Sequence, residues 1–276
     1  MPDLAVAILA HNEAANIAAA ISSISWADQI VVVDASSDDD TGAIARSLGA
    51  QVLIEPNLAN LNINKNIAFE QCQTEWVLAL DADETIPDPL AGEIRKVMID
   101  GRYDGFLIPR RNHVLGKWVR RGSQYPDYQL RLFRKSKGSF RAEHVHERLK
   151  VAGSVGYLVE PMDHHPYPDL ATMIRKNEFY ARFEAAIMFE QGVRVGAFGL
   201  FFRGILKPLG RLLRRLIFKG GFLDGAPGVI MVAFDYWNNV LRYLILWEMR
   251  NEQQIKNLSV NNDNPTADPP RSAAIF

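Results

Sequence analysis

The chain has 276 residues, and 48% of them are hydrophobic, so it can hold one mixed domain with a sizeable core and an appendage. The formal net charge of -1 argues against general nucleic-acid binding, while the single cysteine excludes an internal disulfide and suits a reducing compartment. Asp3, His11 and Glu13 interrupt the first apolar run, and we therefore expect no secretory signal peptide.

Apolar runs alternate with helical patterns along the N-terminal part of the chain. The predicted strands are residues 4–10, 30–33, 51–54 and 76–80, and the predicted helices between them are residues 14–24, 42–48 and 62–73. This alternation predicts an α/β fold in which a mostly parallel central sheet has flanking helices and right-handed crossovers. A later run, residues 129–133, predicts another sheet element.

The strand that begins at Trp76 ends in three carboxylates, Asp81, Asp83 and Glu84. On a strand that continued past Asp81, the side chains of Asp81 and Asp83 would point to one face and could share a hard divalent cation with phosphate oxygens. A solvated, acid-rich turn is the alternative interpretation of this segment taken alone.

Polar side chains also follow two other predicted strands. The first strand is followed by His11, Asn12 and Glu13, and the second by Asp34, Ser37, Asp39 and Thr41. Turn and capping chemistry would explain either cluster by itself. Three polar clusters at the carboxyl edge of one parallel sheet instead favour a binding crevice, because open α/β sheets bind their ligands at that edge.

Together with Lys65-Asn66 on the third predicted helix and Trp76–Glu84, these clusters resemble the family 2 glycosyltransferases, which have the GT-A fold. The resemblance covers about residues 4–150. Within the family, the chain is most similar to bacterial enzymes that add sugars to the lipopolysaccharide core, often glucose onto a heptose. The segments that support this narrower match are residues 130–134, 145–147 and 221–225.

The resemblance implies a set of nucleotide-binding residues: His11, Asn12, Glu13, Asp34, Lys65, Asp81 and Ala82. The turn from His11 to Glu13 would line the nucleotide pocket, and Asp34 would accept hydrogen bonds from the uracil. Lys65 would lie against the base or the phosphates, and Asp81 would contact the ribose or the metal through water. Asp38 and Asp40 depart from the usual family pattern, and we expect both to face outward because a diphosphate is already negative.

For the metal, the resemblance implies a Mg²⁺ or Mn²⁺ ion bound directly by Asp83, with Asp81 beside it. Such an ion stabilises the charge of the leaving diphosphate without a proton transfer. His164 or His165 could supply a third ligand, although the spacing of the histidines matches no compact zinc pattern.

Inversion at the anomeric carbon needs one general base that takes the proton from the acceptor hydroxyl. Glu147 is the first candidate because it lies in a strand-like segment beyond a loop rich in Arg and Gly. Asp127 is the second candidate because it precedes the predicted sheet element at residues 129–133. For either carboxylate, a structural ion pair with Arg131 or Arg148 is the alternative interpretation.

Between Phe198 and Lys219 all charged residues are cations: Arg203, Lys207, Arg211, Arg214, Arg215 and Lys219. At about 100° per residue these cations fall on one side of a helix, while large apolar side chains occupy the other side. Such a segment predicts binding in a membrane interface with anionic lipid, and packing of its apolar face onto the catalytic domain is the alternative. Pro208 should divide or kink the segment and so give two short helices.

Residues 229–247 are strongly apolar, but Asp235, Asn238, Asn239 and Arg242 interrupt them. A spanning helix needs ~20 mostly apolar residues, so we expect a docked or interfacial helix instead. The predicted organisation is a GT-A catalytic domain at residues 1–167, a helical, membrane-associating region at 168–250 and a flexible tail at 251–276.

The sequence thus predicts a cytoplasmic glycosyltransferase that is peripheral on the inner face of the cytoplasmic membrane. It would transfer a hexose, with inversion, from a nucleotide sugar such as UDP-glucose to a lipid-linked glycan such as lipopolysaccharide core. A polyprenyl-phosphate carrier or another envelope glycan is the alternative acceptor. A nucleotidyltransferase would normally carry a Gly-rich early loop where His11-Asn12-Glu13 stands, and a non-catalytic membrane adaptor would not need the pair Asp81 and Asp83.

Overall fold

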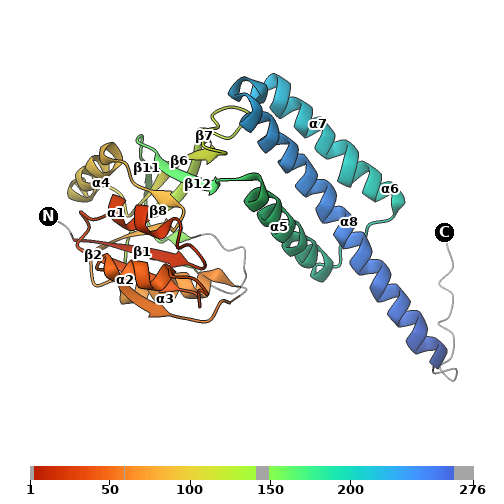
Figure 1. Cartoon of the computed structure of the whole chain (residues 1–276), viewed down its shortest axis with the longest axis horizontal. Coiled ribbons are helices and arrows are strands. Elements are labelled where there is room, and N and C mark those ends of the chain that lie inside the picture. The colour runs from red at the N-terminus through yellow and green to blue at the C-terminus, as the bar shows by residue number, and fades with distance from the viewer. Residues whose placement is uncertain (1–2, 59, 141–148, 264–276) are drawn as a thin grey trace. The chain divides into compact units, whose positions relative to one another are not determined.

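The computed structural model describes residues 3–58, 60–140 and 149–263, with side chains up to residue 253 (Figure 1). The chain divides between Pro168 and Asp169 into two compact units, one α/β and one helical. Within the described ranges, no helix combines the length and the apolar character that crossing a membrane requires.

One half of the sheet in the α/β unit is parallel, with strands in the order β3-β2-β1-β4. These strands are β1 (Leu4–Ala10), β2 (Gln29–Asp34), β3 (Gln51–Ile54) and β4 (Trp76–Asp81). The register pairs Ala10 with Asp34 and Leu9 with Asp81, so the carboxyl ends of β1, β2 and β4 lie at one edge. The prediction of an α/β fold with a mostly parallel central sheet is confirmed.

The other half of the sheet continues from β4 through the antiparallel strands β8 and β6 to β12 and β5. Its strands are β5 (Glu84–Thr85), β6 (Gly105–Val114), β8 (Asp127–Arg134) and β12 (Met162–Tyr167), and β7 (Lys117–Trp118) and β11 (Val155–Tyr157) pair with β6. A separate pair is formed by β9 (Gly138–Ser139) and β10 (Lys150–Val151).

Helices cover both faces of this sheet (Figure 1). They are α1 (Ile17–Ser23), α2 (Thr41–Ser47), α3 (Leu61–Gln71) and α4 (Asp88–Asp100). Side chains of β1 alternate between the faces with the period of two that a strand imposes. Leu4, Val6 and Ile8 pack in one cluster with α1, α2 and α4, whereas Ala5 and Ala7 share the opposite cluster with Phe69 of α3.

The bounds of α4 follow from local signals in the sequence. Pro87 stands immediately before the helix, where a missing backbone N–H has no cost, and Leu90, Ile94 and Met98 repeat every four residues on its buried face. Gly101 ends the helix with a left-handed φ of 63°, a conformation that glycine adopts without strain. The chain then turns into β6.

β4 ends at Asp81, and a turn at Ala82 and Asp83 leads directly into β5. Glu84 closes this turn, because its Oε2 accepts a hydrogen bond from the backbone N–H of Asp81 at 3.0 Å. The strand does not continue past Asp81, so the condition under which Asp81 and Asp83 would point to one face is not met. Asp81 belongs to the strand and Asp83 to the turn, so the two carboxylates have different surroundings.

The helical unit begins with α5 (Leu170–Glu190) and ends with the long helix α8 (Ala226–Asp263). Between them lie α6 (Ala197–Gly199), the π-helical η1 (Leu200–Leu206), α7 (Lys207–Leu213), the π-helical η2 (Arg214–Phe218) and the 3₁₀ turn η3 (Gly221–Asp224). Residues 197–218 are helical throughout, so the expectation of two separate short helices is wrong, but a new α-helical stretch, α7, begins beside Pro208. Pro208 lies in the first turn of α7, where its missing N–H is tolerated. Residues 251–263, predicted as part of a tail, continue α8.

Within the helical unit, α5 and α8 pack through Ala181, Ala185 and Leu246. Gly204 of the segment 197–218 faces α8, where a Cβ on Gly204 would lie 3.1 Å from the Cβ of Tyr243. Ion pairs add to this packing: Arg215 of η2 with Asp235 of α8, and Arg242 of α8 with Glu184 of α5. The large apolar side chains of 197–218 are consequently left on the outside of the unit.

Candidate active site

The loops after β1 and β2 are held together by side-chain hydrogen bonds. The backbone N–H of Asn12 donates to Ser37 Oγ at 2.9 Å, and that of Glu13 donates to Thr41 Oγ1 at 2.8 Å. The backbone N–H of Ala14 donates to Asp39 Oδ2 at 3.1 Å. His11 Nδ1 donates to the Ala35 carbonyl at 2.7 Å. Asn12 adopts a left-handed φ of 56°, which asparagine tolerates better than most residues. Ser37, Asp39 and Thr41 therefore brace a rim at the carboxyl edge of the sheet, while Asp38 and Asp40 are exposed as predicted.

Asp34 lies at the base of this rim, at the end of β2, and only 4% of it is exposed. Its Oδ1 accepts a hydrogen bond from the Ser37 backbone N–H at 2.9 Å. Gly42 at the start of α2 makes room for the carboxylate, because a Cβ there would lie 2.5 Å from Asp34 Oδ2. The carboxylate is thus oriented by the protein before any ligand arrives.

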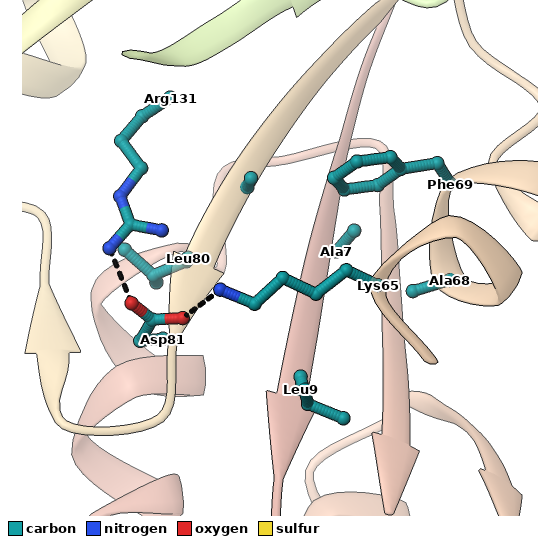
Figure 2. A pocket seen from close by; sticks show the side chains of 9 residues that line it. Ala7, Leu9, Lys65, Ala68, Phe69, Leu80, Asp81 and Arg131 are labelled. Atoms are coloured by element: carbon teal, nitrogen blue, oxygen red, sulfur yellow. Dashed lines mark hydrogen bonds and ion pairs between the residues drawn. The ribbon is translucent and has the colours of Figure 1, made fainter. Parts of the chain in front are cut away.

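A small pocket lies at the ends of β1 and β4 (Figure 2), lined by Ala7, Leu9, Lys65, Ala68, Phe69, Ala79, Leu80, Asp81 and Arg131. Lys65 reaches from α3 to Asp81 Oδ1 at 2.8 Å, and Arg131 of β8 contacts Asp81 Oδ2. Burial alone would raise the pKa of Asp81, but attraction to Arg131 and then to Lys65 holds its pKa well below the usual value. Asp81 is therefore an anion that two cations of the protein already balance.

Glu84 is the buried centre of the same network and has no exposed surface. Its Oε1 accepts hydrogen bonds from Arg131 Nη2 at 2.6 Å and from Arg110 Nη1 at 3.2 Å. Burial raises the pKa of Glu84, although Arg131 opposes the shift. For Arg131 itself, burial would lower the pKa, but Asp81 and Glu84 outweigh it and raise the pKa above its usual value. One charged guanidinium thus joins two carboxylates from the two ends of the turn.

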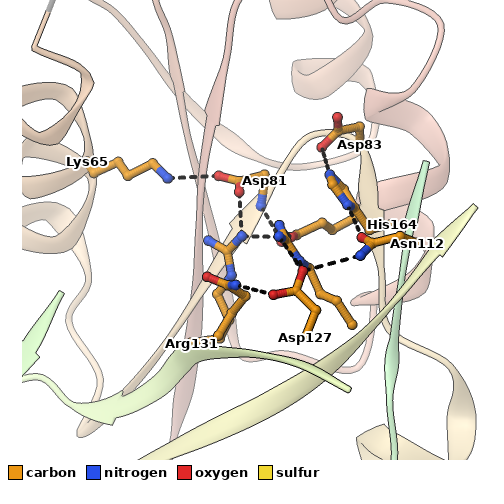
Figure 3. A network of polar contacts seen from close by, with 10 residues as sticks. Lys65, Asp81, Asp83, Asn112, Asp127, Arg131 and His164 are labelled. Atoms are coloured by element: carbon orange, nitrogen blue, oxygen red, sulfur yellow. Dashed lines mark hydrogen bonds and ion pairs between the residues drawn. The ribbon is translucent and has the colours of Figure 1, made fainter. Parts of the chain in front are cut away.

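Asp83, on the outer side of the turn, faces His164 of β12 (Figure 3). Asp83 Oδ1 lies 3.6 Å from His164 Nε2, and the two side chains are only 12% and 14% exposed. Burial lowers the pKa of His164 to about 4, although Asp83 opposes the shift, so the imidazole is neutral near pH 7. A carboxylate oxygen and a neutral imidazole nitrogen both ligate metal ions, and the pair therefore fits a divalent cation.

Asp127, at the start of β8, is surrounded by hydrogen-bond donors. Its Oδ2 accepts from Arg110 Nε at 3.0 Å, Arg110 Nη2 at 2.7 Å and Asn112 Nδ2 at 3.2 Å, and its Oδ1 accepts from Gln129 Nε2 at 2.8 Å. Burial alone would raise the pKa of Asp127, but Arg110 and these hydrogen bonds lower it. A carboxylate with a lowered pKa and engaged oxygens is a weak proton acceptor, which argues against Asp127 as the general base.

The structure places most of the predicted site residues at one edge of the sheet. The set comprises His11, Asn12 and Glu13 in the rim, Asp34, Lys65 and Asp81 beside it, and Ala82 and Asp83 in the turn. Glu147 lies outside the described residues. His165 stacks on His113 with ring centroids 4.6 Å apart, whereas His164 is the histidine whose ring faces Asp83.

Arg110, Asn112 and Arg131 were not assigned to the site from the sequence, although they connect its carboxylates. Arg131 left a signal, because it is a charged residue within the apolar run 130–133 of a predicted strand. Asn112 has no corresponding signal in the sequence, since its neighbours His164 and Asp127 come close only through the pairing of β6 with β12 and β8.

The family model described as "Glycosyl transferase family 2" matches residues 5–209. That range includes the braced rim, the Asp81 network and the pair of Asp83 and His164. The chain belongs to glycosyl transferase family 2. The family predicted from the sequence is thereby confirmed, together with its GT-A fold.

Curated relatives of this family 2 glycosyltransferase align over most of its length. An uncharacterized glycosyltransferase of Rickettsia felis is 29% identical over 276 residues, which cover 94% of this chain and 93% of that protein. The lipopolysaccharide core biosynthesis glycosyltransferase LpsC of Rhizobium meliloti is 26% identical over 238 residues, which cover 82% and 88%.

Solved structures also resemble this chain. S. aureus TarS 1–349 in complex with UDP has 15% sequence identity and a TM-score of 0.47, over 91% of this chain and 92% of that chain. Glucosyl-3-phosphoglycerate synthase from Mycobacterium tuberculosis, in complex with Mn²⁺, UDP and glucosyl-3-phosphoglycerate, has 23% identity and a TM-score of 0.33, over 40% and 44%.

Proposed function

We propose that this family 2 glycosyltransferase transfers a hexose, with inversion, from a UDP-sugar to a lipid-linked glycan, and that glucose is the sugar. The observation that carries the proposal is the juxtaposition of Asp83 and His164 beside the Asp81 network, at the carboxyl edge where β1, β2 and β4 end. Open α/β sheets bind nucleotide ligands at that edge.

Asp83 and His164 would hold Mg²⁺ or Mn²⁺ at the donor diphosphate. In the parts of the chain that the structure describes, no three His, Cys, Asp or Glu side chains are grouped to hold a metal ion, so donor phosphates and water would complete the coordination. The imidazole nitrogen favours Mn²⁺ over Mg²⁺, which prefers oxygen ligands. Such a cation would stabilise the charge that develops on the leaving diphosphate.

The nucleotide would lie along the braced rim. Asp34, oriented by Ser37, is placed at its base to accept hydrogen bonds from the uracil, beside the turn from His11 to Glu13. Lys65 keeps 21% of its side chain exposed while it contacts Asp81, so it can reach a donor from the pocket in Figure 2. Ala82 is the small residue of the turn that separates Asp81 from Asp83.

The similarity to LpsC of Rhizobium meliloti supports lipopolysaccharide core as the acceptor. A glycan on a polyprenyl-phosphate carrier, or another envelope glycan, is the alternative. The test is transfer of labelled glucose from UDP-glucose by purified protein, with lipid-linked core glycan and a polyprenyl-linked glycan offered in parallel. Label on the core glycan would support the assignment, and label on neither lipid-linked acceptor would contradict it.

Replacement of Glu147 by Gln should abolish most of the transfer and leave donor affinity unchanged. The amide fills the same space but cannot accept the proton of the acceptor hydroxyl, and general bases typically contribute about 10²- to 10⁴-fold. Rates and donor Kd values of the parent and of Glu147→Gln give the result. The matched variant is Asp127→Asn, and a collapse of turnover in that variant alone, with Mn²⁺ affinity unchanged, would transfer the role of base to Asp127.

The segment 197–218 presents a broad apolar surface that its own unit does not cover. The exposed side chains include Phe198 (76%) and Phe218 (82%), together with Phe201, Phe202, Ile205, Leu209, Leu213 and Ile217. Exposed cations flank these side chains at Arg203, Lys207, Arg211, Arg214 and Lys219. Arg215, the sixth predicted cation, instead forms an ion pair with Asp235. An apolar face that its own unit leaves uncovered, flanked by cations, supports binding in a lipid interface and with it a peripheral position on the inner face of the cytoplasmic membrane.

Reversal of Arg203, Arg211 and Arg214 to Glu should release the protein from anionic liposomes and leave UDP binding intact. Each cation near an anionic surface contributes about 1 kcal/mol, and salt screens this attraction. Co-sedimentation with anionic and neutral liposomes at two salt concentrations measures the effect. Reversal of Lys96, Arg102 and Lys137, exposed cations of the α/β unit, is the matched control. Equal retention of parent and of the 203/211/214 variant would contradict the membrane assignment.

A further inference from the structure

We propose that Asn112 and Asp127 are positioning residues that fix His164 in the tautomer whose bare Nε2 faces Asp83. This proposal rests on the proposed function, because the cation held by Asp83 and His164 belongs to it. Figure 3 shows the four side chains in one chain of contacts from Asp127 through Asn112 and His164 to Asp83.

The orientation of the Asn112 amide follows from Asp127. An ionised carboxylate can only accept hydrogen bonds, so the group of Asn112 that lies 3.2 Å from Asp127 Oδ2 must be the NH₂ group. Arg110, which donates two hydrogen bonds to Asp127, keeps that carboxylate ionised. The other end of the amide, Asn112 Oδ1, is then an acceptor directed at His164.

The tautomer of His164 follows from Asn112. Because Asn112 Oδ1 accepts, His164 Nδ1, at 2.7 Å, must carry the proton and donate it. In a neutral imidazole the second nitrogen then has no proton, and Nε2 presents its lone pair to Asp83 Oδ1 at 3.6 Å. When the ring is neutral, these two acceptor atoms face each other and are stabilised by a cation, not by a hydrogen bond between them.

The four residues sit on neighbouring elements whose register is set by the sheet. Asn112 of β6 is paired directly with His164 of β12, and Asp127 of β8 is paired with Arg110 two residues before Asn112. Side chains two residues apart on a strand share a face, which places Arg110 and Asn112 together against Asp127. The hydrogen-bonded relay, by which we mean Asp127, Asn112 and His164, is thus built on paired strands. Hydrogen bonds to the far nitrogen of a metal-ligating histidine orient its ring in this way.

The first test needs neither metal nor donor. Long-range ¹H–¹⁵N correlation spectra of the metal-free parent, with His164 assigned from a His164→Gln variant, report which ring nitrogen carries the proton. We expect the Nδ1–H tautomer at every pH at which the ring is neutral. An Nε2–H tautomer would overturn the proposal whatever the enzyme transfers.

The second test replaces Asn112 by Leu, which keeps the size of the side chain and removes both hydrogen bonds. We expect loss of the Nδ1–H tautomer and a fall in Mn²⁺ affinity of about 10- to 100-fold, measured by electron paramagnetic resonance without any donor. Gln129→Leu is the matched control: Gln129 also donates an amide hydrogen bond to Asp127, at 2.8 Å, but has no contact with His164 among the described hydrogen bonds. The tautomer of His164 and the Mn²⁺ affinity in Gln129→Leu should match those of the parent.

The outcomes separate this proposal from the proposed function. If Asn112→Leu keeps the parent tautomer, Asn112 is not a positioning residue, even where the fold and the transfer reaction are intact. If His164→Gln binds Mn²⁺ as tightly as the parent while the Nδ1–H tautomer is observed, the metal assignment fails and the hydrogen-bonded relay stands.

Discussion

Replacement of Asp83 by Asn should abolish Mn²⁺-dependent binding of UDP-glucose and reduce transfer by about 10³-fold or more, with the fold intact. The reason is the loss of the only anionic ligand in the pair that faces the proposed cation, and a metal ion typically contributes several kcal/mol of charge stabilisation in the transition state. The fold should survive because Asp83 lies in a turn and the buried ion pairs of Asp81 and Glu84 do not include it.

Asp40→Asn is the matched control for this variant. Asp40 is an exposed carboxylate at the start of α2, and its replacement changes the net charge by the same amount. Calorimetric titration of UDP-glucose into each variant, with Mn²⁺ present, gives the comparison. Unchanged Mn²⁺-dependent binding by Asp83→Asn would remove Asp83 from the metal site.

Replacement of Arg131 by Met should strongly destabilise the α/β unit, with a loss of about 3–5 kcal/mol of unfolding free energy. The guanidinium is only 9% exposed and contacts both Asp81 and Glu84, so its removal leaves the buried Glu84 and the partly buried Asp81 without their shared cation. Arg182→Met, which breaks an exposed pair with Glu178 on α5, is the control and should lose less than about 1 kcal/mol.

The loss in Arg131→Met should depend on pH. In the parent, the pKa of Asp81 is held below its usual value, so Asp81 contributes stability above the unfolded pKa of about 3.9 and loses it as the pH falls through the folded pKa. Without Arg131 both carboxylates should have raised pKa values, which makes the variant weakest near pH 7 and less impaired near pH 5. Urea unfolding at both pH values measures this. A loss as small as that of Arg182→Met, or a loss that grows toward pH 5, would contradict the role given to Arg131.

The parallel half of the sheet was predictable because its signals are local. The apolar runs of β1 and β3 gave the observed bounds, residues 4–10 and 51–54, and the helices between the strands carry their own periodicity. β6 was not predictable, since three polar residues, Arg110, Arg111 and Asn112, follow one another in it. They are tolerated there because side chains of the neighbouring strands bind them. Arg110 pairs with Asp127 of β8 and Arg111 with Asp163 of β12, contacts that no local pattern contains.

The candidate site divides in the same way. Asp34, Asp81 and Asp83 were predicted because polar residues at the ends of apolar strands are visible in the sequence. The assignment of Asp81 to a metal or a ribose could not foresee Lys65 and Arg131, which come from α3 and β8 and balance its charge. The choice of His164 over His165 required the turn of β4 into β5, since that turn decides which ring meets Asp83.

The central claim is that Asp83 and His164 hold a divalent cation against the diphosphate of a nucleotide sugar. Calorimetric titration of UDP-glucose into the purified full-length chain, with Mn²⁺ and then with EDTA, tests it most directly. We predict binding with Mn²⁺ and a large loss of affinity with EDTA. Equal affinity under the two conditions, or no binding of UDP-glucose or of UDP under either, would contradict the account.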